Sequence, residues 1–99
     1  CSSAYPYGAS FDADRCNTAS ADSVPRELAA AGSRSRCRSR EGIYDLSGNA
    51  AEWLADGTAV GGSFASASDD ARCDTVGSWA TDELGFRCCL DAEVVAPAP

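Results

Sequence analysis

The chain has 99 residues, a net charge of −7 and no His. This acidic balance disfavours a nucleic-acid partner, because the phosphate backbone attracts clusters of Lys and Arg, and no apolar run is long enough to span a membrane. Only 14 residues are Leu, Ile, Val or Phe. The core of such a small single domain is thin, so crosslinks or a bound ion must supplement it.

Six cysteines supply candidate crosslinks: Cys1, Cys16, Cys37, Cys73, Cys88 and Cys89. None of them forms a C-x-x-C pair, and zinc sites usually bring their ligands in such closely spaced pairs. We therefore expect disulfides and, with them, an extracytoplasmic location, secreted or periplasmic. We expect the last two cysteines to have separate partners, because a bridge between neighbours needs a strained peptide.

The first third of the chain predicts a turn, a loop and one short helix. Pro fixes φ and Gly frees it in the motif YPYG at residues 5–8, so this turn can direct both Tyr rings inward. The Asp-, Ser- and Ala-rich run 9–21 is a loop. A helix is predicted over 23–32, with Ser23 as its cap and Gly32 at its end.

An arginine-rich segment follows the predicted helix. Arg34, Arg36, Arg38 and Arg40 alternate with Ser, Cys and Ser, which places all four on one side of an extended chain. Such a face is either a patch for an anion or a partner, or a solvated loop that balances nearby acidic residues. The sequence does not choose between these two interpretations.

The motif GIYDLSGNAAEW, at residues 42–53, concentrates more chemistry than any other stretch. It combines two carboxylates, an Asn, two Gly and two aromatic residues. Its NAAE segment also has the pattern of a capped helix start. After a polar turn at 56–57, the motif GGSF at 61–64 has a Gly pair that lets another backbone approach closely. A terminal strand is expected over 85–90, followed by an Ala- and Pro-rich tail.

Taken in order, the motifs YPYG, CN at 16–17, GIYDLSGNAAEW, GGSF and GFRC at 85–88 resemble the C-terminal part of the formylglycine-generating enzyme (sulfatase-modifying factor) family. The resemblance covers residues 1–90 and implies one α+β domain, a variant of the C-type lectin fold with short strands, few helices and much loop. It also implies that the family's N-terminal portion is missing. The chain is then a monomer or part of a larger chain, and residues 91–99 form a flexible tail.

The resemblance implies a calcium site in the loop at 45–52. Its ligands are the side chains of Asp45 and Glu52 and the carbonyls of Gly48 and Ala50, which are the hard oxygens that calcium prefers. Positions 48, 50 and 52 alternate in an extended chain, which favours that conformation over the capped helix. Without a cation, the two acids are ordinary turn and surface residues. A second and poorer set of ligands is Asn17, Thr18 and Asp22.

The resemblance also bears on catalysis. Oxidases of the family bind copper through two cysteines after the GGS-aromatic motif, and thiolates suit Cu(I). Those positions are Ser66 and Ala71 in this sequence, so we expect no catalytic residues of that kind. Cys73 alone cannot supply two thiolates, and we expect it in a disulfide.

The family's crosslink ties a Cys ahead of the Pro-aromatic-Gly turn to the Cys of GFRC. In this sequence the resemblance therefore implies a bond between Cys1 and Cys88. Closing so long a loop stabilises a domain by on the order of 4 kcal/mol in the chain-entropy model. The remaining pairs are then Cys16 with Cys37 and Cys73 with Cys89.

Trp53 and Phe86 are expected in the core, because little else can fill it.

Three functions remain open at this point. The first is a non-catalytic, calcium-stabilised extracytoplasmic module that binds an unknown protein or small ligand or serves a structural role. The second is an oxidase that converts a sulfatase cysteine to formylglycine, which needs the missing cysteine pair. The third is the C-terminal lobe of a larger iron-dependent enzyme similar to the sulfoxide synthases, against which the expected disulfides argue.

Overall fold

Short strands and tight turns are the regular elements of this domain. The computed structural model describes residues 1–88. Its elements are β1 (Ala51–Trp53), β2 (Ala59–Val60), η1 (Ser68–Ala71), η2 (Thr81–Glu83) and β3 (Leu84–Gly85), where η marks a 3-10 helix. Within this range no helix has the length and apolar character needed to cross a lipid bilayer. The coarse prediction of an irregular, loop-rich α+β domain with short strands and few helices is confirmed.

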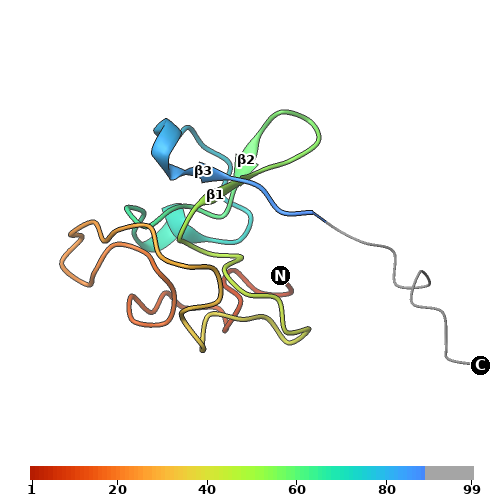
Figure 1. Ribbon diagram of the computed structural model, residues 1–99. Coiled ribbons are helices and arrows are strands. Elements are labelled where there is room, and N and C mark those ends of the chain that lie inside the picture. The colour runs from red at the N-terminus through yellow and green to blue at the C-terminus, as the bar shows by residue number, and fades with distance from the viewer. Residues whose placement is uncertain (89–99) are drawn as a thin grey trace, which may run out of the picture.

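The three strands form one mixed sheet in the order β2-β1-β3 (Figure 1). β1 and β2 are antiparallel, with Glu52 opposite Val60, whereas β3 runs parallel to β1 and brings Gly85 opposite Glu52. The polar turn predicted between β1 and β2 is present, and Asp56 Oδ1 accepts a hydrogen bond from the Thr58 amide at 2.9 Å. Glu52 therefore lies in the central strand, with a neighbour on each side.

The predicted terminal strand is much shorter than expected. β3 contains only Leu84 and Gly85, and residues 86–88 continue without strand pairing. The rest of the predicted strand, with Cys89, and the tail over 91–99 lie outside the described residues.

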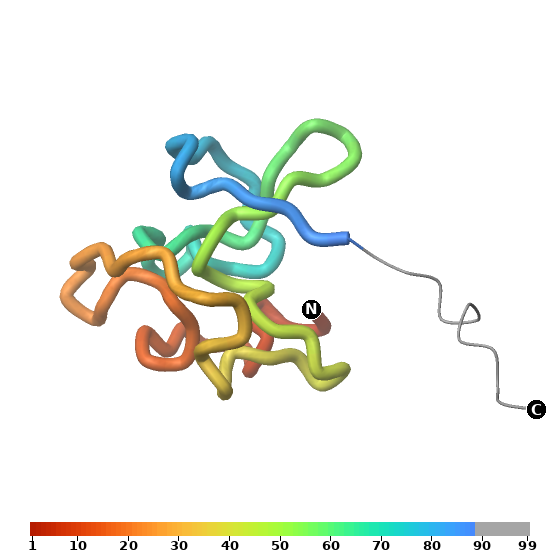
Figure 2. The backbone as a smooth tube through the Cα atoms, viewed as in Figure 1, coloured from red at the N-terminus to blue at the C-terminus, as the bar shows by residue number. Residues whose placement is uncertain are grey.

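Loops and turns make up the chain before β1, as the tube in Figure 2 shows. The predicted turn at 5–8 forms, with Tyr5 and Gly8 exchanging two backbone hydrogen bonds of 3.0 and 3.2 Å. The rings of Tyr5 and Tyr7 stack with their centroids 5.6 Å apart. Tyr5 is buried and Tyr7 is half-buried, so the turn directs one ring fully inward.

No helix forms over 23–32, where the sequence predicted one. Its backbone groups are bound by distant side chains instead. The Glu27 carbonyl accepts a hydrogen bond from Asn17 Nδ2 at 2.7 Å, and the Ala29 amide donates to Asn49 Oδ1 at 2.9 Å. These contacts replace intrahelical bonds in a segment whose two large apolar side chains stay more than half exposed.

Apart from the buried ring of Tyr5, the core consists of small and polar side chains. The largest fully buried side chains are Thr18, Cys16, Cys37, Ser47 and Ser63. The prediction that Trp53 and Phe86 fill the core is wrong, because these residues are 50 % and 78 % exposed. Ala51 is fully buried two residues before Trp53 in β1, so the packed region ends within the strand before it reaches the Trp ring.

Two disulfides crosslink residues 1–88. The predicted bond between Cys16 and Cys37 is confirmed. The predicted pairs Cys1–Cys88 and Cys73–Cys89 are wrong, because Cys1 is bonded to Cys73. The Cys73 amide donates to the Ala4 carbonyl at 2.9 Å, which holds this segment beside the N-terminus. Cys88 lies beyond β3 as an exposed free thiol.

Two glycines allow the loop before β1 to pack against its neighbours. A Cβ on Gly48 would lie 2.6 Å from the Asn17 carbonyl oxygen, and one on Gly61 would lie 2.8 Å from the Leu46 oxygen. The Gly48 amide donates to the Gly61 carbonyl at 2.8 Å. The close backbone approach predicted for the GGSF motif is confirmed, and it fixes the loop that carries the candidate ligands.

Candidate functional site

Three of the four residues predicted as calcium ligands line one cavity. Asp45, Ala50 and Glu52 border a space of about 290 Å³, and Arg87 borders it as well. Gly48 does not line this space. The other lining residues are Ala31, Tyr44, Asn49, Gly85 and Phe86. The cavity therefore lies where the loop before β1 meets the chain that leaves β3.

The loop at 45–50 is bent rather than extended. Asp45, Gly48 and Asn49 have φ values of +59°, +78° and +64°. Strand conformation begins only at Ala51. The predicted alternation of positions 48, 50 and 52 along an extended chain is therefore wrong at Gly48, and the alternative of a helix starting at Asn49 does not form either.

Asp45 is a buried carboxylate with one oxygen committed. Its exposed fraction is 9 %, and its Oδ2 accepts a hydrogen bond from the Gly32 amide at 2.8 Å. No hydrogen bond within residues 1–88 uses its Oδ1. A buried carboxylate with a single amide partner retains acceptor capacity for a further donor or a cation.

Glu52 has an internal cation as its partner. Arg87 Nε donates to Glu52 Oε1 and Arg87 Nη2 donates to Oε2, both at 2.6 Å. Arg87 Nη2 also donates to the Tyr44 carbonyl at 2.8 Å. This two-bond pairing of guanidinium with carboxylate is the strong form of such an ion pair. It ties the chain after β3 to β1 and to the loop before it.

The residues at this cavity fit calcium in kind, but one of them is already paired. The donors are two carboxylates and a main-chain carbonyl, as hard cations require. Arg87 engages both oxygens of Glu52, so calcium can use this carboxylate only after the guanidinium has left it. Within residues 1–88 no three His, Cys, Asp or Glu side chains are grouped to hold a metal ion.

The second predicted set of ligands also meets an arginine. The Asn17 carbonyl accepts from the Asn49 amide at 2.7 Å, and the Thr18 carbonyl accepts from Arg26 Nη1 at 3.1 Å. Arg26 Nη1 donates to the Ala13 carbonyl as well, at 2.6 Å. Asp22, the third predicted ligand, lies in an exposed turn. A guanidinium therefore occupies the Thr18 carbonyl and a backbone amide occupies the Asn17 carbonyl, the two oxygens to which this site was assigned.

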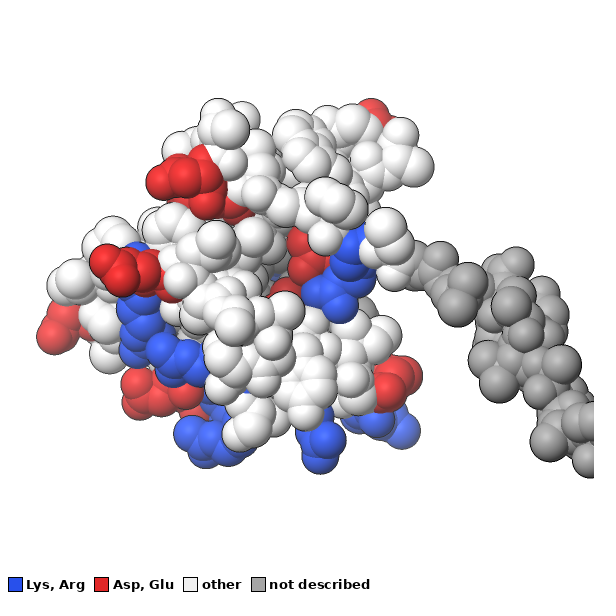
Figure 3. Space-filling model, viewed as in Figure 1, with Lys and Arg blue, Asp and Glu red and all other residues white. Residues whose placement is uncertain are grey.

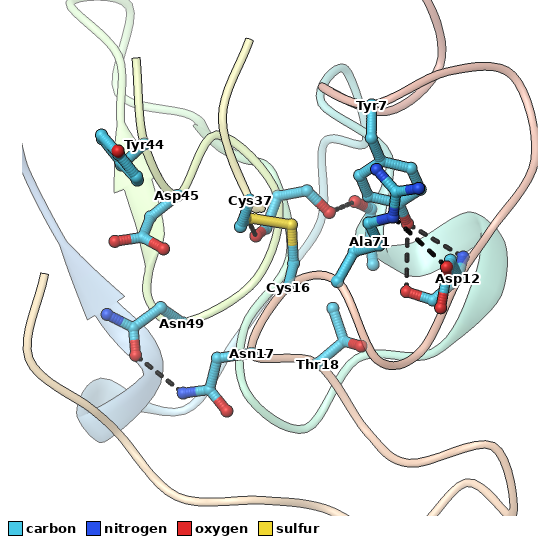
Figure 4. Close-up of a disulfide and its surroundings, with 12 residues drawn as sticks. Tyr7, Asp12, Cys16, Asn17, Thr18, Cys37, Tyr44, Asp45, Asn49 and Ala71 are labelled. Carbon is cyan, nitrogen blue, oxygen red and sulfur yellow. Dashed lines mark hydrogen bonds and ion pairs between the residues drawn. A yellow bond between two sulfur atoms is a disulfide. The ribbon is translucent and has the colours of Figure 1, made fainter. Parts of the chain in front are cut away.

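Two side-chain amides form a buried connection that sequence reasoning did not identify. Asn17 Nδ2 donates to Asn49 Oδ1 at 2.8 Å, beside the Cys16–Cys37 disulfide (Figure 4). Asn49 Nδ2 donates to the Ala29 carbonyl at 3.0 Å. Asn17 and Asn49 are 32 positions apart, so no local sequence pattern shows that they are bonded. Their amides fasten the segment around Ala29 to the loop that carries Asp45.

The positions of the family's copper-binding cysteines are close to Gly62 of the GGSF motif, where a Cβ would lie 2.8 Å from Ala71 Cα and 3.1 Å from Ser66 Cβ. Ser66 is buried, and its Oγ accepts hydrogen bonds from the Ser63 amide at 2.9 Å and from Trp79 Nε1 at 3.3 Å. Ala71 is fully buried, and its carbonyl accepts from the Ser47 hydroxyl. Cys73 is bonded to Cys1. The hydrogen bonds and burial of Ser66 and Ala71 are those of residues that pack the fold.

Comparison with known proteins gives no family assignment. No family model, no curated protein and no solved structure matches this chain. The resemblance to the sulfatase-modifying-factor family therefore rests on the sequence motifs.

Proposed function

We propose that this chain is a non-catalytic relative of the sulfatase-modifying-factor family, with a reduced form of its C-type-lectin-like fold. It serves as an extracytoplasmic binding or structural module that calcium stabilises. The observation that carries the proposal is the shared cavity of Asp45, Ala50 and Glu52. These are three of the four residues to which the family motif assigns the ion, and Gly48 is the fourth.

The absence of oxidase chemistry is supported by the residues at the copper positions. A hydroxyl and a methyl group stand there, at Ser66 and Ala71, and neither provides the soft thiolate that Cu(I) requires. The nearby thiol of Cys73 is consumed in a disulfide. Two intramolecular disulfides also favour an oxidising compartment, as expected of an extracytoplasmic module.

Calcium would link the loop before β1 to the central strand by joining Asp45 and Glu52. Arg87 already joins β1 to the chain after β3. The proposal therefore includes an exchange of partners at the Glu52 carboxylate. Calcium binds this carboxylate in place of the Arg87 guanidinium, which moves to solvent or to another acceptor. The calcium affinity is reduced by the free energy of breaking that ion pair.

Thermal unfolding with calcium and with a chelator tests the ion. We expect a higher melting temperature with calcium, and we expect Asp45→Asn combined with Glu52→Gln to remove the difference. Glu41→Gln is the matched control, because Glu41 is an exposed carboxylate outside the cavity. Equal melting temperatures with calcium and with chelator in the wild-type chain would exclude the calcium site.

Incubation with copper, O₂ and a cysteine peptide of the sulfatase type tests the lack of oxidase activity. We expect the peptide mass to remain unchanged. An aldehyde product detected by mass spectrometry would show that the domain is an oxidase and overturn the proposal, whatever the calcium result.

A further inference from the structure

A second cavity of this acidic domain is lined by arginines. It measures about 520 Å³, a size typical of small-ligand sites. Arg36, Arg38 and Arg40 line it from one segment, and Arg15 lines it from another. The other lining residues are Pro6, Tyr7, Ser35, Ser39 and Gly42. No carboxylate is among them, so the lining does not neutralise its own charge.

The fold turns the alternating sequence into a one-sided face. Cys37 is fully buried and Ser39 is 6 % exposed, while Arg36, Arg38 and Arg40 are exposed. The burial of Cys37 follows from its disulfide. Arg34 lies in a turn and does not line the cavity, so three of the four predicted arginines share the face. Figure 3 shows Arg side chains gathered along the lower edge of the molecule, where the yellow part of the chain runs in Figure 2.

These three guanidinium groups, like that of Arg34 in the same segment, have no partner in the described part of the chain. Each arginine outside the 34–40 segment forms an ion pair with a carboxylate: Arg15, Arg26, Arg72 and Arg87. Within residues 1–88 the side chains of Arg36, Arg38 and Arg40 form no hydrogen bond or ion pair. In a chain of net charge −7, three unneutralised guanidiniums around one space favour an anionic ligand.

Tyr7 and Arg15 form a fixed wall of the cavity. The Arg15 guanidinium lies 5.5 Å from the centroid of the Tyr7 ring, and Arg15 Nε lies 3.4 Å from Asp12 Oδ2. Burial raises the pKa of Tyr7, whose hydroxyl donates to the Asp12 carbonyl, so this ring adds no negative charge. Because the ring already contacts Tyr5 and Arg15, it is not a free platform for stacking a nucleic-acid base.

We propose that this cavity binds a sulfated oligosaccharide through Arg36, Arg38 and Arg40. The planar guanidinium fork pairs with two oxygens of an oxyanion such as sulfate. The space is larger than one oxyanion needs, and Ser35, an exposed residue of its lining, suits a sugar hydroxyl. The two disulfides favour an oxidising compartment, which agrees with a ligand outside the cytoplasm. This site is separate from the cavity at Asp45 and does not depend on calcium.

Titration calorimetry with a size-defined heparin oligosaccharide tests the site on the full chain. We expect binding that weakens as salt increases, because contacts with a polyanion release counterions. The triple variant Arg36→Gln, Arg38→Gln and Arg40→Gln should lose about tenfold or more in affinity. Each single variant should lose a smaller part of the affinity, which keeps the test valid if the triple variant does not fold.

The control variant is Arg34→Gln, which removes the same charge from the same segment but outside the cavity. We expect it to retain at least half of the wild-type affinity. Equal losses for Arg34→Gln and Arg38→Gln would show a diffuse charge effect and overturn the site. Equal binding of a desulfated oligosaccharide of the same length, or of a DNA oligonucleotide of the same charge, would overturn the sulfated sugar as the ligand class.

Discussion

The loop region before β1 and the three-stranded sheet are stabilised by different means. The loop region has a fully buried disulfide, Cys16–Cys37, and the connected amides of Asn17 and Asn49. The sheet has strands of two and three residues and leaves Trp53 half exposed. A chain with few large apolar residues thus relies at its centre on covalent and hydrogen-bonded contacts, with Tyr5 as the one buried aromatic residue of residues 1–88.

This difference explains how loops can hold candidate binding residues in fixed positions. Backbone groups buried without regular secondary structure must find partners elsewhere, since each unpaired group costs free energy. Asn49 pairs with the amide and the carbonyl of Ala29, and Arg26 pairs with the carbonyls of Ala13 and Thr18. Side chains therefore provide hydrogen-bond partners for backbone groups of the loop region, whereas neighbouring strands provide them for β1.

Of the four changes that test this difference, removal of the Cys16–Cys37 bond should lower the free energy of unfolding most. The bond closes a loop with a sequence separation of 21, and loop-closure entropy assigns it about 3 kcal/mol. We expect Cys16→Ala with Cys37→Ala to lower the free energy of unfolding by at least that amount in urea titrations. Cys88→Ala, at an exposed free thiol, is the control and should change little.

Asn49→Ala should cost about 2 to 3 kcal/mol. The change removes one of the two acceptors of Asn17 Nδ2 and the side-chain partner of both backbone groups of Ala29, and buried polar groups that lose a partner are costly. It also places Ala at a φ of +64°, which Asn tolerates better. Asn49→Asp keeps the acceptor and should lose less. A urea midpoint unchanged by Asn49→Ala would show that the side-chain amides of Asn17 and Asn49 do not stabilise the fold.

Breaking the pair between Glu52 and Arg87 should have a smaller effect. The side chains are 20 % and 37 % exposed, so solvent screens the pair, and Arg87→Gln should cost about 1 kcal/mol. The cost should shrink as salt increases. Unfolding measured at low and high salt, with Arg72→Gln as a control that breaks a more exposed pair, distinguishes this ion pair from packing.

Truncation of the exposed aromatic residues should have the smallest effect. Trp53→Ala and Phe86→Ala each remove a ring that is at least half exposed, and surface changes away from special features stay within about 0.5 kcal/mol. A loss of about 3 kcal/mol or more, the range for a core aromatic residue, would mean that the sheet rather than the loop region holds the domain.

Local signals in the sequence predicted several features correctly. They include the YPYG turn, the turn at 56–57 and the close approach of the GGSF motif. Each depends on residues whose conformational limits are local, such as Pro and Gly. The helix predicted over 23–32 does not form, because backbone groups of this segment form hydrogen bonds with Asn17 and Asn49, which are distant in sequence.

The sequence indicated which carboxylates lie at the candidate cation site, but it did not indicate that an arginine is paired with one of them. The motif at 42–53 indicated Asp45 and Glu52, and both line one cavity. Arg87 is 35 positions from Glu52, and nothing in the local pattern shows that the two are paired. Likewise, the sequence indicated the alternation of Arg36, Arg38 and Arg40, but Arg15 joins them only through the fold.

The most direct test of the central claim follows the Arg87 Nε–H resonance by NMR during a calcium titration. The account predicts that this proton shifts and exchanges faster as calcium saturates, because the ion takes Glu52 from the guanidinium, and that the amides of residues 45–52 shift with the same midpoint. Asp45→Asn should abolish both changes. A calcium titration that leaves the Arg87 signal and these amides unmoved would contradict the proposed calcium site.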